Sequence, residues 1–238
     1  MSEGSSTRRG FLRHTSILSS SLLIPPLAAA QQKPVPGNEK AKGDEGISPA
    51  EDLMREHGVL NRILLIYDEH LRMLAAKRTF DGSVLASAAE IVRQFVEEYH
   101  EKLEEGFLFP RFRKAGKFVT LVNTLEAQHK AGRELTAKIK ELAGVATLKY
   151  VSSDSEKLSD ALRAFVRMYR PHEAREDTVL FPAFRSIISA HEYDALGDDF
   201  EKKEDELFGD EGFFKVVEQV AELEKKLGIH ELAQFTPK

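Results

Sequence analysis

Apolar residues recur three and four positions apart along most of the chain, which is the period of an α-helix with one buried face. The pattern breaks at short polar or glycine-containing stretches and so divides residues 48–188 into four segments. It predicts helices over about 49–77, from 83 to about Pro110, 118–143 and from 153 to about Pro182. Four helices joined by short loops indicate an all-α protein, an up-down-up-down four-helix bundle.

Capping residues support these boundaries. Ser48-Pro49-Ala50-Glu51 has the serine N-cap, first-position proline and third-position glutamate of a helix start. A second start at Ser189 opens a C-terminal helical extension, residues 189–238, in which glycines 209 and 212 precede a last amphipathic helix over 213–227. Pro110 lacks a backbone donor and is expected to kink or end the second helix.

Four histidines interrupt the apolar stripes, and they belong to a repeat. Residues 100–113 (HEKLEEGFLFPRFR) and 172–185 (HEAREDTVLFPAFR) share the histidine, the glutamates one and four positions after it, Leu-Phe-Pro, a later phenylalanine and the final arginine. The same spacing of 72 residues links His57 to His129. The chain therefore contains two copies of a two-helix unit, in which the first helix carries one histidine and the second carries His-x-x-x-Glu.

Histidine and glutamate four positions apart lie on one face of a helix. Two units would direct four imidazoles and two carboxylates into one bundle. A single core histidine is more often structural, but six such groups at matching depth are costly to bury without compensation. We therefore predict a metal site made by the following residues: His57, His100, Glu104, His129, His172 and Glu176.

The chain has no cysteine, so any metal must be held by nitrogen and oxygen. Imidazole and carboxylate ligands suit first-row transition metals. In the simplest symmetric arrangement each of two ions takes two histidines, and both glutamates bridge the pair. An ion that prefers six ligands then keeps open positions for a small molecule.

These motifs resemble the hemerythrin-like family, also called the HHE cation-binding domain. The resemblance covers about residues 51–185 and implies a four-helix bundle with a non-haem di-iron centre. It implies the four histidines as terminal ligands and the two glutamates as bridges, with two iron ions as cofactors and other divalent cations as alternatives.

Two positions depart from the oxygen-carrying members of that family. Where they have a fifth histidine, this chain has Arg133. Their bridging acid, five residues after the last histidine, corresponds here to Asp177, whereas the repeat favours Glu176. Whether Asp177, Glu101 or Glu173 adds a ligand stays open at this point.

Other residues are assigned by position. We expect His70 at the surface, His191 in a helix cap and His230 in the tail, all without metal. Gly132 in mid-helix indicates that something needs space beside His129. Tyr67, Tyr99 and Tyr169 are expected mainly to pack in the core, and the Leu-Phe-Pro segments to plug its end. A formal charge of −5 gives no indication of nucleic-acid binding.

The N-terminus resembles a twin-arginine export signal. Arg8-Arg9-Gly10-Phe11-Leu12 precedes a short broken apolar run, and alanines 28–30 offer a cleavage site. We interpret residues 1–30 as a removable signal and 31–47 as a disordered linker. The run is too short to span a bilayer, so we expect a periplasmic protein without stable membrane insertion.

Three functions remain open. The first is a protein that binds dioxygen, nitric oxide or peroxide at a di-iron centre, for sensing, storage or carriage. The second is a di-iron oxidase or peroxidase, which Arg133 in place of a fifth histidine slightly favours. The third is a zinc- or manganese-loaded structural or interaction protein, whose partner the sequence does not indicate.

Overall fold

The computed structural model describes residues 47–143 and 153–237, all within one compact unit, Glu45–Lys238. The predicted export signal, nearly all of the predicted linker and the loop 144–152 lie outside the described residues. Within the described ranges every regular element is a helix. The expected all-α class is therefore confirmed.

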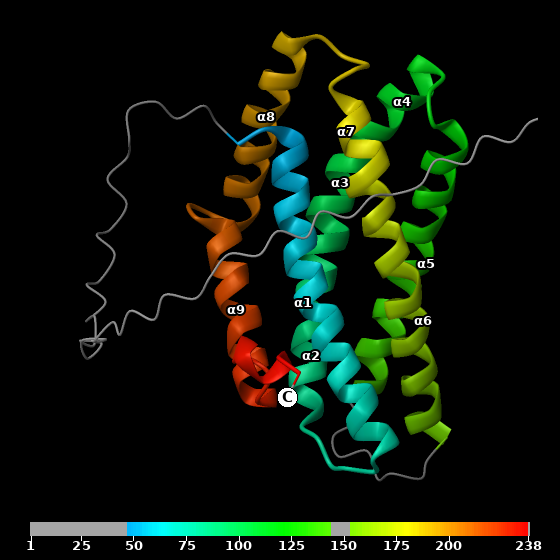
Figure 1. Cartoon of the computed structure of the whole chain (residues 1–238), viewed down its shortest axis with the longest axis vertical. Helices are drawn as coiled ribbons and strands as arrows, with labels where there is room; N and C mark the ends of the chain where they lie inside the picture. Colours follow the sequence, from blue (N-terminus) through cyan, green and yellow to red (C-terminus); the bar gives the residue numbers. More distant parts are fainter. Residues whose placement is uncertain (1–46, 144–152, 238) are drawn as a thin grey trace, which may run out of the picture. The chain divides into compact units, whose positions relative to one another are not determined.

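Four helical arms form a bundle (Figure 1). The first arm is α1, Pro49–Ala75. The second runs without interruption through α2 (Gly82–Ile91), η1 (Val92–His100), α3 (Glu101–Leu103), η2 (Glu104–Leu108) and α4 (Phe109–Ala115). The third is α5, Val119–Ala143, and the fourth joins α6 (Ser153–Arg175), η3 (Glu176–Leu180) and α7 (Phe181–Phe184).

Consecutive arms run in opposite directions (Figure 1). Helix α5 packs on α6 and α2, while α1 packs on α6 and on η1, which closes the ring of four neighbours. The interior is filled by large apolar side chains, among them Tyr67 and Phe165, whose ring centroids lie 5.2 Å apart. The predicted bundle of antiparallel helices is confirmed.

Three segments of the arms are π-helices, which the sequence pattern did not predict: η1, η2 and η3. Two of them begin at repeat-related glutamates, Glu104 and Glu176, and each ends just before Phe-Pro. The backbone N–H of Phe109 bonds to Glu104 O, and that of Phe181 to Glu176 O. Of the two effects expected of Pro110, ending the helix is excluded, because the arm stays helical to Ala115. The proline follows a π turn instead, because its missing donor removes one α-type bond there.

Helix starts follow the capping residues. Ser48 Oγ accepts from the N–H of Glu51 at 3.3 Å, and Ser189 Oγ accepts from the N–H of Glu192 at 3.1 Å. Asp81 caps α2 through the N–H of Ser83. Such caps satisfy backbone donors that the first helical turn leaves free. They place the starts of α1 and α8 where the sequence predicts them.

The C-terminal extension consists of α8 (Ala190–Phe208), α9 (Gly212–Leu227) and a short 3-10 turn, Leu232–Phe235. Both helices pack on α1. Arg62 of α1 donates from Nε and an Nη atom to the two carboxylate oxygens of Glu224 in α9, at 2.8 and 2.7 Å. Phe208 contributes a ring against Tyr99 of the bundle. The extension is thus joined to the first two arms.

His70 is not at the surface, and that expectation was wrong. Its side chain is fully buried, its Nδ1 donates to Ile66 O at 2.8 Å, and its ring meets Phe80 edge to face. The turn between α1 and α2 brings Phe80 over the face of α1 that the single apolar stripe leaves uncovered.

Among the described residues no helix combines the length and the apolar content that crossing a bilayer requires.

Candidate metal centre

The six predicted residues come together inside the bundle. All are buried, and their ligand atoms form two overlapping groups, each with atoms within 4.8 Å of one another. One group contains His57, His100 and Glu104. The other contains His129 and His172 with both glutamates.

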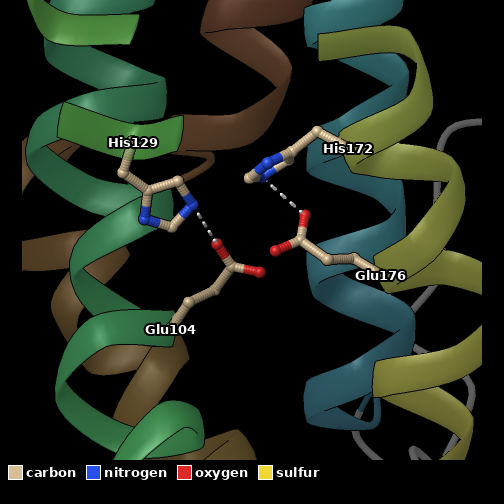
Figure 2. Close-up of side chains that lie close together, drawn as sticks. All are labelled: Glu104, His129, His172 and Glu176. Atoms are coloured by element: carbon tan, nitrogen blue, oxygen red, sulfur yellow. Dashed lines mark ion pairs between the residues drawn. The ribbon is translucent and has the colours of Figure 1, made fainter. Parts of the chain in front are cut away.

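The imidazole Nε2 atoms point at the two glutamates. Figure 2 shows His129 facing Glu104 of a neighbouring arm and His172 facing Glu176 of its own arm, with 3.3 and 3.0 Å between Nε2 and the carboxylate oxygen. His57 Nε2 lies 3.4 Å from Glu176 and His100 Nε2 lies 3.7 Å from Glu104. Each glutamate therefore lies between one histidine of each repeat unit.

The outer nitrogen of every ring faces an oxygen. His57 Nδ1 lies 2.7 Å from Asp177 Oδ1, and His100 Nδ1 lies 2.6 Å from Glu56 Oε2. His129 Nδ1 lies 3.2 Å from Glu105 Oε1, and His172 Nδ1 lies 3.0 Å from Gln128 Oε1. When a cation occupies the centre and the outer carboxylates are ionised, Nδ1 donates to its outer oxygen and the lone pair of Nε2 is free for the metal. Metal-binding histidines are held in this way.

The centre contains buried polar atoms that lack hydrogen-bond partners. Both oxygens of Glu104, both oxygens of Glu176 and Nε2 of His129 have none. Leaving such atoms unpaired in an apolar interior is costly. Cations between the two carboxylates and the four nitrogens would satisfy them, so the donor set fits a pair of metal ions.

The electrostatics agree with a cation site. Burial, reinforced by the charge of Glu176, raises the pKa of Glu104 to about 8. For His129 burial works downward, but the nearby carboxylates of Glu104 and Glu105 outweigh it and raise the pKa to about 10. Without a metal, protons therefore supply the positive charge that the carboxylates need. A dication would replace them and favour the anionic carboxylates.

Phenylalanines of the Leu-Phe-Pro segments cover the centre. The ring of Phe109 stacks on His129 at 5.4 Å between centroids, and Phe181 stacks on His57 at 5.3 Å. All four rings are buried. These segments are therefore walls of the site, a closer role than the end plugs that the sequence suggested.

The three acids left open by the sequence lie outside the inner ring. Asp177 contacts the outer nitrogen of His57. Glu101 accepts from Tyr169 Oη at 2.8 Å and pairs with Arg133 at 2.7 Å, and Glu173 accepts from Asn61. None faces an Nε2 atom within ion-pair distance in the described structure.

Gly132 leaves the space that Tyr169 fills. A Cβ at residue 132 would lie 2.0 Å from Tyr169 Oη. Tyr169 is therefore both a core residue and the donor to Glu101. Of the histidines assigned no metal, His191 is exposed, and His230 Nδ1 lies 3.2 Å from Glu224, remote from the six residues of the centre.

Sequence reasoning missed the outer acceptors Glu56, Glu105 and Gln128. The repeat could have found them, because Glu56 and Gln128 are 72 residues apart, as are Glu105 and Asp177. Each of the three is adjacent in sequence to one of the six predicted ligands. The pattern of histidines and glutamates therefore drew the prediction to the neighbouring residue instead.

The fold and the centre define a metal-binding four-helix bundle. Residues 48–184 match the model of the Hemerythrin HHE cation binding domain. The chain belongs to this family, which implies that it binds metal cations.

Similar proteins occur in mycobacteria. The chain is 45% identical to "Uncharacterized protein Rv1995" of Mycobacterium tuberculosis and, equally, to "Uncharacterized protein Mb2018" of Mycobacterium bovis. Each comparison spans 191 residues, 80% of this chain and 74% of the relative. No solved structure matches the chain significantly.

Proposed function

We propose that the bundle holds two iron ions and binds a small oxidising or diatomic ligand between them. His57 and His100 hold one ion, His129 and His172 hold the other, and Glu104 and Glu176 bridge both. The observation that carries this proposal is the set of four inward-facing Nε2 atoms around two buried carboxylates that lack hydrogen-bond partners.

Iron bound there would supply redox equivalents and open coordination positions for dioxygen, nitric oxide or peroxide. The chain's own residues prepare the site for this. The outer oxygens of Glu56, Glu105, Gln128 and Asp177 fix the four ring orientations, and the stacked phenylalanines exclude water. Four protein ligands per ion leave positions free, which suits ligand binding, sensing or storage.

A second candidate function is an oxidase or peroxidase. The observation that favours it is Arg133, which occupies the place of a fifth ligand histidine and pairs with Glu101 and Glu105 instead. Without a fifth nitrogen both ions keep incomplete protein coordination. A site that is open on both ions is suited to turnover as well as to reversible binding.

The test begins with protein purified without oxygen, loaded with ferrous iron and then exposed to air. We expect about two irons per chain and an oxygen-dependent charge-transfer band. Retention of zinc or manganese in place of iron, with a silent spectrum, would contradict the iron assignment.

Peroxide distinguishes the two candidates. A band that disappears reversibly when oxygen is removed, with no consumption of peroxide, supports a binding protein. Steady consumption over many equivalents per chain supports an enzyme. A Glu104→Ala, Glu176→Ala double variant controls for free iron, because it keeps the outer acids while removing both proposed bridges.

We also propose export to the periplasm by the twin-arginine route, supported by the Arg8-Arg9 motif, the short apolar run after it and the alanines at 28–30. Cell fractionation of the full chain tests it, with Arg8→Lys, Arg9→Lys as the paired variant. Mature protein in the periplasm of the wild type and its loss in the variant are expected. Equal processing of both would contradict the assignment.

A further inference from the structure

The two halves of the centre are built from repeat-related residues, but their surroundings differ in charge. We call the pair His57 and His100 position one, and the pair His129 and His172 position two. Each residue of the repeat that surrounds the histidines of position one has a counterpart 72 residues away in the sequence, which takes the same place at position two. Differences between counterparts therefore show how the chain distinguishes the two positions. Any difference in metal affinity between them presupposes the proposed metal pair.

The first difference is at the histidines of the His-x-x-x-Glu motifs. His100 Nδ1 lies 2.6 Å from Oε2 of the Glu56 carboxyl group. Its counterpart His172 donates to the amide oxygen of Gln128, at 3.0 Å. Glu56 directly precedes His57, the other histidine of position one, and Gln128 directly precedes His129, the other histidine of position two. Position one has an ionisable acceptor where position two has a neutral one.

The second difference lies behind the lone histidines. The acceptor for His57 is Asp177, which forms no ion pair with Lys or Arg in the described structure. The acceptor for His129 is Glu105, whose carboxylate also pairs with Lys102 and Arg133. Two cations thus compete for the oxygen atoms that would polarise His129.

The third difference is one turn further along α1 and α5. Asn61 donates to Glu173 beside position one, and its counterpart Arg133 pairs with Glu101 beside position two. The carboxylate beside position one is therefore paired with a neutral amide, and the carboxylate beside position two is paired with a guanidinium. The arginine cancels one carboxylate charge at position two only.

The C-terminal extension adds to the imbalance. Ligand atoms of Asp52, Glu56 and Glu204 of α8 lie within 4.8 Å of one another, behind His100. Arg55 offsets one of them, through an ion pair with Asp52 at 3.3 Å. The counterpart of Asp52 is Thr124, which is exposed and donates to Thr120 O. At position two the carboxylates that gather beside a histidine are Glu101 and Glu105, next to His129, and Arg133 pairs with both of them.

An imidazole whose outer N–H is bonded to a carboxylate is a stronger electron donor to a metal than one bonded to an amide. Added anions also favour a dication, and nearby cations oppose it. We propose that position one binds its metal ion more tightly than position two, so that the centre loads and unloads in two steps. Glu56 and Gln128 are the positioning residues that set this order, with Arg133 reinforcing it.

The experiment uses the full chain, loaded with two equivalents of ferrous iron without oxygen and then titrated with a competing chelator. Bound iron is measured at each step. We expect a plateau near one ion per chain, with apparent affinities of the two ions separated by about tenfold or more, the scale of outer-ligand effects on metal sites.

Reciprocal variants locate the steps. Glu56→Gln gives both positions an amide acceptor and should weaken the tight step by about tenfold, erasing the plateau. Gln128→Glu gives both a carboxylate and should strengthen the weak step. Arg133→Asn installs the counterpart residue and should shift the weak step in the same direction as Gln128→Glu. Circular dichroism of each variant confirms that the bundle is folded.

Two results would overturn the inference while leaving the metal pair intact: release of both irons of the wild type in one step, or a Glu56→Gln change that weakens the second ion and not the first. A wild-type chain that binds no iron, or never more than one ion, refutes the proposed pair itself. ⁵⁷Fe Mössbauer spectra give an independent reading, because unequal positions produce two quadrupole doublets that Gln128→Glu should bring together.

Discussion

Asp177 Oδ1 lies 2.7 Å from Nδ1 of His57, while Glu176 faces Nε2 of the same ring at 3.4 Å. Adjacent acids thus contact opposite sides of one imidazole. We expect Glu176→Ala to abolish binding of the metal pair, because the proposed bridge touches both ions. Asp177→Ala should keep two ions at saturation and lower the affinity by about tenfold, as the loss of an outer ligand does.

Metal content after gel filtration, together with a chelator titration, checks this pair of variants. Glu104→Ala is the matched control and should behave as Glu176→Ala does, since the two glutamates are repeat counterparts. Full metal content in Glu176→Ala, with loss in Asp177→Ala, would mean that the bridge is Asp177.

Gly132→Ala should destabilise the protein. The new methyl would lie 2.0 Å from Tyr169 Oη, and the ring is enclosed on all sides, so relieving the overlap strains the core by about 1–3 kcal/mol. Gly58→Ala is the control, because nothing lies within 4 Å of its added Cβ and alanine favours a helix by about 1 kcal/mol. Urea unfolding should move in opposite directions for the two variants, and equal shifts would contradict the packing.

Asp52→Asn should stabilise the metal-free protein at neutral pH. Burial, followed by the charge of Glu204, raises the pKa of Asp52 to about 6 in spite of Arg55. Its contribution to stability is therefore complete below about pH 4 and is lost as the pH rises through about 6, a loss of about 1–3 kcal/mol.

Urea unfolding of metal-free wild type and Asp52→Asn at pH 4 and pH 7 measures this difference. The wild type should lose more stability than the variant between the two values. A steeper loss in Asp52→Asn than in wild type would mean that the carboxylate is stabilised by Arg55 after all.

His70→Ala should cost about 2–3 kcal/mol of stability and leave the metal content unchanged. The substitution removes a fully buried ring that packs on Phe80 and donates to Ile66 O, at a point away from the centre. Thermal unfolding with metal analysis tests both parts. His191→Ala, at an exposed position, should change stability by less than about 0.5 kcal/mol.

The sequence predicts the fold and the six central residues well because the repeat states the same information twice. The helical spacing of the apolar residues places each histidine on the buried face of its helix. The second copy of the motif shows that this placement is not a coincidence. The roles of those residues as metal ligands stay a prediction.

What the sequence could not show depends on contacts between distant segments. His70 lies away from the main stripe of α1, and it is buried because Phe80 folds back over it and the extension widens the covered part of α1. The π turns at Glu104 and Glu176 likewise escape a search for helical period, since one extra residue per turn leaves little trace in a short stripe.

The stacking of Phe109 on His129 and of Phe181 on His57 has a consequence for the origin of the chain. Each half of the repeat supplies the aromatic ring that covers a histidine of the other half, and Glu104 and Glu176 each face one histidine of their own half and one of the other. Neither half alone would supply both the histidines of its position and the ring that covers them. A single two-helix ancestor would have needed to pair with a copy of itself, so the present chain has the form of a homodimer fused into one polypeptide and then made unequal.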